Sequence, residues 1–184
     1  MSISLISLKL YCKSSTEVVD FAPHVTFIHG EIATGKSSIA RLIDFCLGGD
    51  LERTPALQDE LVSVQLSLTT NDYNVIIERE AIGSRQVQIK WSNDKGVSEN
   101  RLVPLVKTET PIFGDDIYTL SDLLLFLLKI PNLKVPKSSR ADDASPVGLS
   151  FRDIMWYCYL EQDTLESCFY TIWNRTHSNP VFTT

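Results

Sequence analysis

The fold of this chain is decided by residues 30–37, which read Gly30-Glu31-Ile32-Ala33-Thr34-Gly35-Lys36-Ser37. This stretch matches the pattern G-x-x-x-x-G-K-[ST] in full. The glycines of such a loop let the backbone turn tightly, so that consecutive N–H groups point at one phosphate group. The lysine places a positive charge beside the outer phosphates, and the hydroxyl of the last residue binds Mg²⁺. The stretch therefore predicts a phosphate-binding loop (a Walker A motif) with ATP and Mg²⁺ as cofactors.

The residues on either side of the loop have the patterns that this motif requires. Residues 25–28 are β-branched or aromatic, which is typical of a strand buried on both faces. From about Lys36 to Leu47 apolar residues recur every three or four positions, which predicts an amphipathic helix. Gly48 and Gly49 then end this helix as a glycine C-cap. A buried strand before the loop and a helix after it favour nucleotide binding over a plain glycine turn.

Beyond the helix the apolar residues alternate with polar ones. This alternation predicts strands over 62–69, 73–77 and 87–91 and near 102–103, separated by turn residues. Together they form an antiparallel meander at about 61–106 with one face toward water. We also predict a strand over 6–10, a leucine-rich helix opened by Ser121 and Asp122 and ended by Pro131, and a surface loop over 131–148. A capping box at Ser150–Asp153 is expected to start a further helix.

Efficient hydrolysis needs an acidic residue on a neighbouring strand to hold Mg²⁺. Glu78 ends an apolar run, but that run lies in the meander, where an antiparallel hairpin holds Glu78 away from the phosphates. The second acidic half of the site is therefore missing from this sequence. We expect the chain alone to bind ATP without efficient turnover.

Composition narrows the class of protein. The chain has 184 residues, 43% of them hydrophobic and 22% charged, which fits one globular domain and excludes wholesale disorder. A formal net charge of -6 argues against a broad basic surface for nucleic acid. The cysteines have no metal-ligand spacing with each other or with the histidines, which indicates reduced thiols in a cytoplasmic protein. No apolar run approaches the roughly 18 residues that span a bilayer, so no membrane partner is expected.

Residues 8–14 and 21–30, with the Walker A loop and Ile39, resemble the N-terminal ATPase lobe of the SMC/SbcC-like proteins. These are the ABC-type, coiled-coil AAA ATPases of DNA repair, chromosome organisation and antiphage defence. The resemblance implies an α/β fold: a P-loop NTPase N-terminal lobe with an antiparallel β-meander subdomain, which is an incomplete ABC/SMC-type head. It covers residues 1–165, and residues 166–184 are expected to form an irregular tail.

The resemblance also implies site residues. Residues 149–165 are similar to the family's Q-loop region, and the Q-loop glutamine falls on Gln162, where it reaches Mg²⁺ and the attacking water. Lys13 matches the basic residue near the nucleotide. The catalytic residues are then Lys36 and Gln162, and the metal ligands are Ser37 and Gln162. The nucleotide-binding residues are Lys13, Gly30, Glu31, Ile32, Ala33, Thr34, Gly35, Lys36, Ser37 and Ser38, with Ile32 and Ala33 standing where the family usually has Asn and Gly.

Members of this family continue into a coiled coil and a C-terminal lobe with a signature sequence, an acidic strand and a switch histidine. None of these is visible in this sequence. The resemblance therefore implies an ATP-binding N-terminal half that pairs with a complementary C-terminal lobe or forms a homodimer across ATP. In the assembled complex it implies DNA and a nuclease subunit as partners, in DNA repair, DNA processing or antiphage defence.

Two alternatives from other classes stay open. One is a small P-loop kinase, although a kinase follows its loop with parallel strands and an arginine-bearing lid rather than a meander. The other is a non-catalytic interaction module that binds a nucleotide as a structural or switch ligand.

Overall fold

The computed structural model describes residues 2–31, 34–51, 54–83, 85–114, 116–131, 133–136, 146–155 and 158. The chain divides into two compact units, Met1–Lys129 and Ile130–Thr184. The first unit contains the larger sheet and three helices, α1 (Lys36–Cys46), α2 (Pro55–Glu60) and α3 (Leu120–Leu127). Among the described residues, no helix has the length and apolar character needed to cross a membrane.

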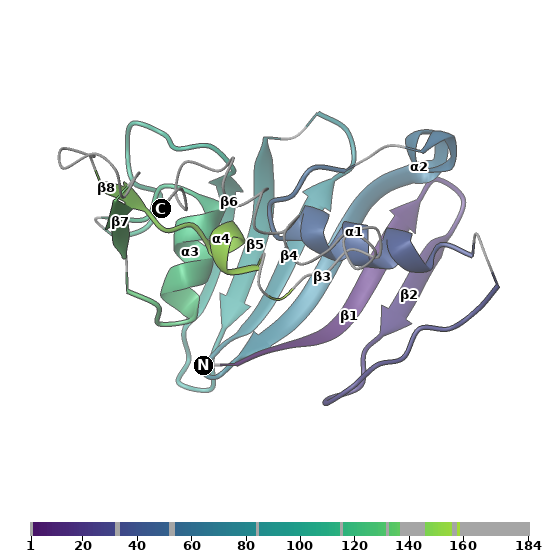
Figure 1. Ribbon diagram of the computed structural model, residues 1–184, viewed down its shortest axis with the longest axis horizontal. Helices are drawn as coiled ribbons and strands as arrows, with labels where there is room; N and C mark the ends of the chain where they lie inside the picture. The colour runs from purple at the N-terminus through teal and green to yellow at the C-terminus, as the bar shows by residue number, and fades with distance from the viewer. Residues whose placement is uncertain are drawn as a thin grey trace. The chain divides into compact units, whose positions relative to one another are not determined.

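The first unit is built on a six-stranded sheet with the order β2-β1-β3-β4-β5-β6 (Figure 1). All neighbouring strands in it are antiparallel. The strands β3 to β6 follow one another along the chain and form the meander that the alternating pattern predicts. The strands are β1 (Ile3–Cys12), β2 (Thr16–Asp20), β3 (Leu61–Thr70), β4 (Asn74–Glu80), β5 (Gln86–Ser92) and β6 (Ser98–Pro104).

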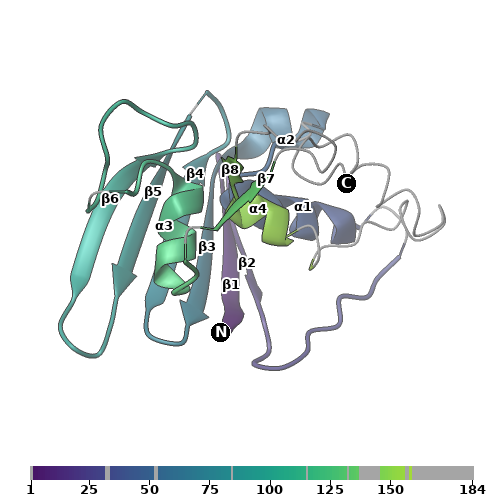
Figure 2. The ribbon, with the colours of Figure 1, turned by 60° about the vertical axis from the view of Figure 1, so that its left-hand side comes forward.

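One face of this sheet carries the core. The register places Leu8, Leu66, Ile77 and Ile89 side by side across four strands, and all are fully buried. Helices α1 and α3 lie on this face (Figure 2) and add a set of buried side chains: Leu42, Phe45, Cys46, Leu120, Leu123, Leu124, Leu125 and Leu127. The opposite face carries mainly polar side chains, with the exposed Ile76 and Leu102 among them, as the alternation predicts for a sheet with one wet face.

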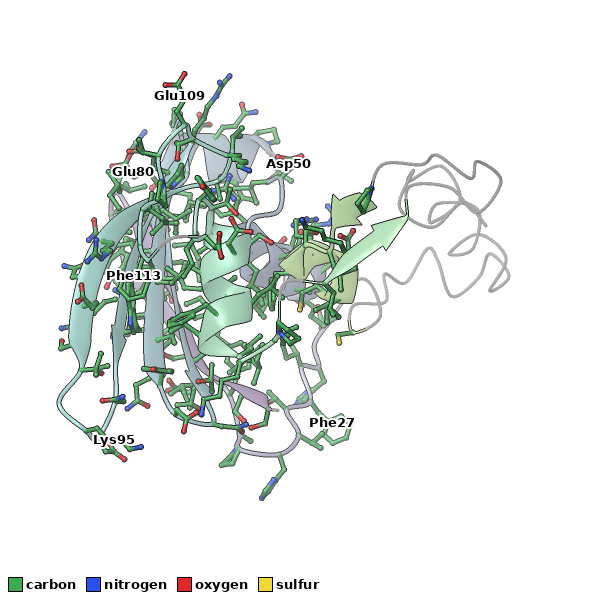
Figure 3. All side chains as sticks on the ribbon, turned by 90° about the vertical axis from the view of Figure 1, so that its left-hand side faces the viewer. Phe27, Asp50, Glu80, Lys95, Glu109 and Phe113 are labelled. Atoms are coloured by element: carbon green, nitrogen blue, oxygen red, sulfur yellow. The ribbon has the colours of Figure 1, made fainter. Side chains whose placement is uncertain are left out.

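The segment between β2 and α1 departs from the sequence prediction. A strand buried on both faces is expected over residues 25–28, but no strand lies between Asp20 and Lys36 in the described residues. Val25 is 61% exposed and Phe27 is 86% exposed; Phe27 lies on the stretch of chain that leaves the sheet (Figure 3). A β-branched run becomes a strand only when a neighbouring strand pairs with its backbone, and here the sheet ends at β2. The prediction of a buried strand is therefore wrong for this structure.

The ends of the helices lie close to the positions that local capping signals predict. Helix α1 ends at Cys46, one residue before the predicted end, and Gly48 follows with a left-handed φ of 101°. Helix α3 is opened by Thr119 rather than by Ser121, because Thr119 and Asp122 form a capping box. Helix α2 was not expected from the sequence, although proline at its first position is a favourable start.

The second unit is small in its described part. Strands β7 (Lys134–Pro136) and β8 (Pro146–Gly148) pair antiparallel, where the sequence predicts only a surface loop over 131–148. Helix α4 (Phe151–Met155) starts at the predicted capping box: the Asp153 N–H donates to the Ser150 hydroxyl at 3.2 Å, and the Ser150 N–H donates to Asp153 Oδ2 at 2.8 Å. The predicted boundary at 165/166 and the tail that follows it lie outside the described residues.

Candidate functional site

The glycine-rich loop closes on the side chain of Lys36. The Lys36 ammonium donates to the carbonyl oxygens of Gly30 at 2.9 Å and Glu31 at 2.5 Å. It also donates to the Thr34 hydroxyl at 3.2 Å, and this hydroxyl donates in turn to the Glu31 carbonyl oxygen at 2.8 Å. The loop backbone therefore holds the positive charge that the motif assigns to the outer phosphates.

Two glycines allow the chain to follow this path. Gly35 has φ 83° and ψ 9°, a left-handed conformation that strains any residue with a Cβ atom. At Gly30 an added Cβ would lie 3.0 Å from the Thr34 hydroxyl oxygen, closer than ordinary packing allows. A side chain at either position would therefore shift the loop and the lysine that it holds.

The loop leads directly into the N-terminus of α1. Gly35 is the N-cap, no side chain caps this end through a hydrogen bond, and the first turn contains no acidic residue. The first N–H groups of a helix have no partner within the helix, and the helix dipole adds a partial positive charge there. Ser37 is exposed in this turn and Ser38 is half-buried. Such an end is suited to bind an anion, and a phosphate group fits it.

The opposite end of α1 is fixed to the sheet. Leu42, Phe45 and Cys46 are buried, and the Cys46 sulfur lies 3.8 Å from the Val64 carbonyl oxygen. Burial raises the pKa of the Cys46 thiol to about 12, so this group stays protonated. The N–H groups of Gly48 and Gly49 donate to carbonyl oxygens of α1 at 3.1 and 2.9 Å, which confirms that these glycines form a C-cap.

Sequence reasoning missed Arg79, which also holds this end of α1. Its guanidinium Nη1 donates to the Phe45 carbonyl oxygen at 2.6 Å and to the Gly49 carbonyl oxygen at 2.7 Å. The signal is present in the sequence, because Val75, Ile77 and Arg79 share one period-two register. A charged residue on the apolar face of a strand is buried only with a partner.

The other predicted residues lie in different places. Lys13 follows β1 with an exposed side chain, and its N–H donates to the Glu60 carbonyl oxygen at 2.9 Å. Its role toward a nucleotide stays a prediction. Ile32, Ala33 and Gln162 lie outside the described residues, so their roles stay predictions as well.

Glu78 projects from the polar face of the sheet, whereas α1 packs on the apolar face. The Glu78 carboxylate accepts a hydrogen bond from the Ser63 hydroxyl at 3.1 Å and another from the Gln65 side-chain amide at 3.5 Å. This position agrees with the expectation that the meander holds Glu78 away from the phosphates.

A polar cavity of about 440 Å³ lies between the turns of the meander. It is lined by residues 69–74 and 93–95 and by Lys129. No residue of the predicted phosphate-binding loop contributes to it, so this cavity is not the predicted nucleotide site.

The loop and the start of α1 fit a nucleoside triphosphate with Mg²⁺. The glycine path, the uncapped helix end and the ammonium of Lys36 supply donors and positive charge for phosphate oxygens, and the Ser37 hydroxyl is an oxygen ligand of the kind that Mg²⁺ accepts. No curated protein sequence shows a significant match to the chain. A family model described as an AAA domain matches residues 2–155, which include the sheet, the loop and α1. The chain therefore belongs to this family of AAA-type ATPase domains.

Proposed function

We propose that this chain binds ATP with Mg²⁺ as the N-terminal half of an SMC/SbcC-like ATPase head. The observation that carries the proposal is the loop itself, in which three hydrogen bonds hold the Lys36 ammonium at the uncapped N-terminus of α1. Positive charge and free N–H groups are thus gathered at one point of the chain, as phosphate binding requires.

In this proposal each residue of the loop has a separate task. Lys36 exchanges its contacts with the carbonyl oxygens of Gly30 and Glu31 for contacts with the outer phosphates. Ser37 ligates Mg²⁺ through its hydroxyl, and the N–H groups at the start of α1 bind phosphate oxygens. The bound nucleotide supplies the phosphoryl group, and the metal ion neutralises its charge.

The segment before the loop supports a head that is completed by another lobe. Val25, Phe27 and Ile28 are 61%, 86% and 41% exposed, although their composition is that of a buried strand. We propose that strands of the complementary C-terminal lobe pair with this segment and that the same lobe brings the acidic metal ligand. From the resemblance we also propose that two such heads pair across ATP. DNA and a nuclease subunit are the partners that the resemblance implies for the assembled complex.

The topology disfavours one of the two alternatives. A small P-loop kinase surrounds its loop with parallel strands, whereas all neighbouring strands of the six-stranded sheet are antiparallel. A non-catalytic nucleotide-binding module shares the loop geometry, and turnover measurements separate it from a half-head.

The test compares ATP binding by the wild type, Lys36→Ala and the control Lys90→Ala. Lys90 is an exposed lysine on β5, outside the loop. With Mg²⁺ and ATP at about 100 times Kd, we expect wild type and Lys90→Ala to gain about 2.7 kcal/mol of stability in thermal unfolding. Lys36→Ala should lose most of this gain. Equal gains for all three proteins would refute ATP binding through this loop.

Phosphate release then tests whether the chain is half of a catalytic head. We expect the chain alone to bind ATP without multiple turnovers and the addition of the complementary C-terminal lobe to start hydrolysis that Lys36→Ala blocks. Multiple turnovers by the purified chain alone would contradict the half-head and show a complete catalytic site.

A further inference from the structure

Arg79 is a charged side chain in the apolar core of the first unit. It is 7% exposed and lies on β4, in the same register as the buried Val75 and Ile77. Burial of a guanidinium is costly unless other groups replace the water that it loses. The groups that replace this water around Arg79 therefore indicate the role of its charge.

Arg79 contacts the C-terminal end of α1 and the residues that follow it. Its Nη1 donates to the carbonyl oxygens of Phe45 and Gly49, at 2.6 and 2.7 Å, and its Cζ lies 3.9 Å from the centroid of the Phe45 ring. The last carbonyl groups of a helix lack partners within the helix, and the dipole makes this end negative. No basic residue stands in the last turn of α1 itself, so Arg79 brings the cation from the sheet.

Helix α1 is held unevenly along its length. Its buried side chains are Leu42, Phe45 and Cys46, all in its C-terminal half, while Lys36 to Ala40 at the phosphate-binding end are exposed or half-buried. The anchored end therefore sets the direction of the helix. A helix of this length measures about 16 Å, so a tilt of about 5° at one end moves the other by about 1.4 Å.

We infer that Arg79 is a positioning residue for the ATP site. By fixing the C-terminal end of α1 to β4, it fixes where the loop, the Lys36 ammonium and the Ser37 hydroxyl stand. This inference rests on the proposed function, because it assigns to Arg79 an effect on ATP affinity as well as on stability. Displacements of about 1 Å in such a site change its performance strongly, since bound groups must meet in a fixed geometry.

The matched control is Arg101, a second arginine in the register of the apolar face, on β6. Its Nη1 donates to the Ile112 carbonyl oxygen at 3.1 Å, and its Cζ lies 5.1 Å from the centroid of the Phe113 ring. Arg101 thus makes two kinds of contact that Arg79 also makes, but it holds a different segment. It differs from Arg79 in that its side chain is 40% exposed and also pairs with Glu99 at 3.2 Å. Arg79→Met and Arg101→Met both keep an apolar stem and remove the charged donors.

The experiment measures Kd for ATP with Mg²⁺ at a temperature where every variant is folded. We expect Arg79→Met to raise Kd at least about fivefold, the lower end of couplings between separate sites. Arg101→Met should leave Kd unchanged even where it lowers the melting temperature. Arg79→Lys should bind more tightly than Arg79→Met, because an ammonium can still donate to both carbonyl oxygens. If Arg79→Met does not fold, Arg79→Gln, which keeps an amide donor, takes its place.

Hydrogen exchange gives a second measurement that needs no nucleotide. Amides in the first turns of α1, residues 37–40, should exchange faster in Arg79→Met than in the wild type and in Arg101→Met. Wild type that binds no ATP would refute the proposed function and the positioning role with it. Wild type that binds ATP with the same Kd as Arg79→Met would leave the proposed function standing and overturn the positioning role.

Discussion

The substitution Phe27→Ser tests whether Phe27 stabilises the free chain or contributes to binding of the complementary lobe. Phe27 is 86% exposed, so its loss should change the free energy of unfolding of the chain by no more than about 0.5 kcal/mol, as for other surface positions. If the complementary lobe covers residues 25–28, the same substitution removes the burial of a phenylalanine, which contributes about 1.5–3 kcal/mol. The Kd for the lobe should then rise by about 10- to 150-fold.

The assay is titration calorimetry of the chain with the C-terminal lobe supplied separately, together with urea unfolding of the chain alone. Ile82→Ser is the control, because Ile82 is an exposed apolar residue at 61% exposure in the turn between β4 and β5. It should change neither quantity. The reasoning fails if Phe27→Ser destabilises the free chain by more than about 1 kcal/mol, which is the mean effect of a substitution. It also fails if both variants bind the lobe as tightly as the wild type.

Three further predictions follow from the site. Gly35→Ala should lower the free energy of unfolding by about 1 kcal/mol and also weaken ATP binding. The control is Gly96→Ala, because Gly96 has a similar left-handed φ of 86° outside the loop. In the same unfolding and binding assays it should show only the loss of stability. Burial raises the pKa of Cys46 from 9.0 to about 12, so the folded state keeps a proton that the unfolded state loses. The contribution of this thiol to the stability to urea should therefore fall as pH rises through this range, and Cys46→Ala should make the decline shallower. Gln162→Ala should reduce the effect of Mg²⁺ on ATP binding more than the affinity measured in EDTA, and an unchanged Mg²⁺ dependence would remove Gln162 from the site.

Local patterns predict most of the first unit. The alternation from Val62 to Trp91 predicts the meander because each strand buries one face, and the period of α1 predicts a helix whose glycine C-cap the structure confirms. These features depend on residues close together in the chain. The geometry of the loop also depends on residues that are close in the chain, since Gly30, Gly35 and Lys36 lie within seven consecutive positions.

The features that the sequence could not predict depend on distant residues. The run at 25–28 has the composition of a buried strand, but whether it pairs depends on strands elsewhere. Arg79 lies 34 residues from Phe45, and only the packing of α1 on β4 brings them together. The pairing of β7 with β8 is also invisible in the sequence, because both are short and contain proline.

The exposed run at 25–28 also has a consequence for how this chain behaves in solution. Backbone groups of a β-branched, aromatic segment without a neighbouring strand offer a template on which a second copy can pair. The tendency to aggregate should therefore rise with protein concentration and fall when Phe27 is replaced by a charged residue. The concentration up to which the isolated chain stays monodisperse should then depend on the segment that leads into its glycine-rich loop.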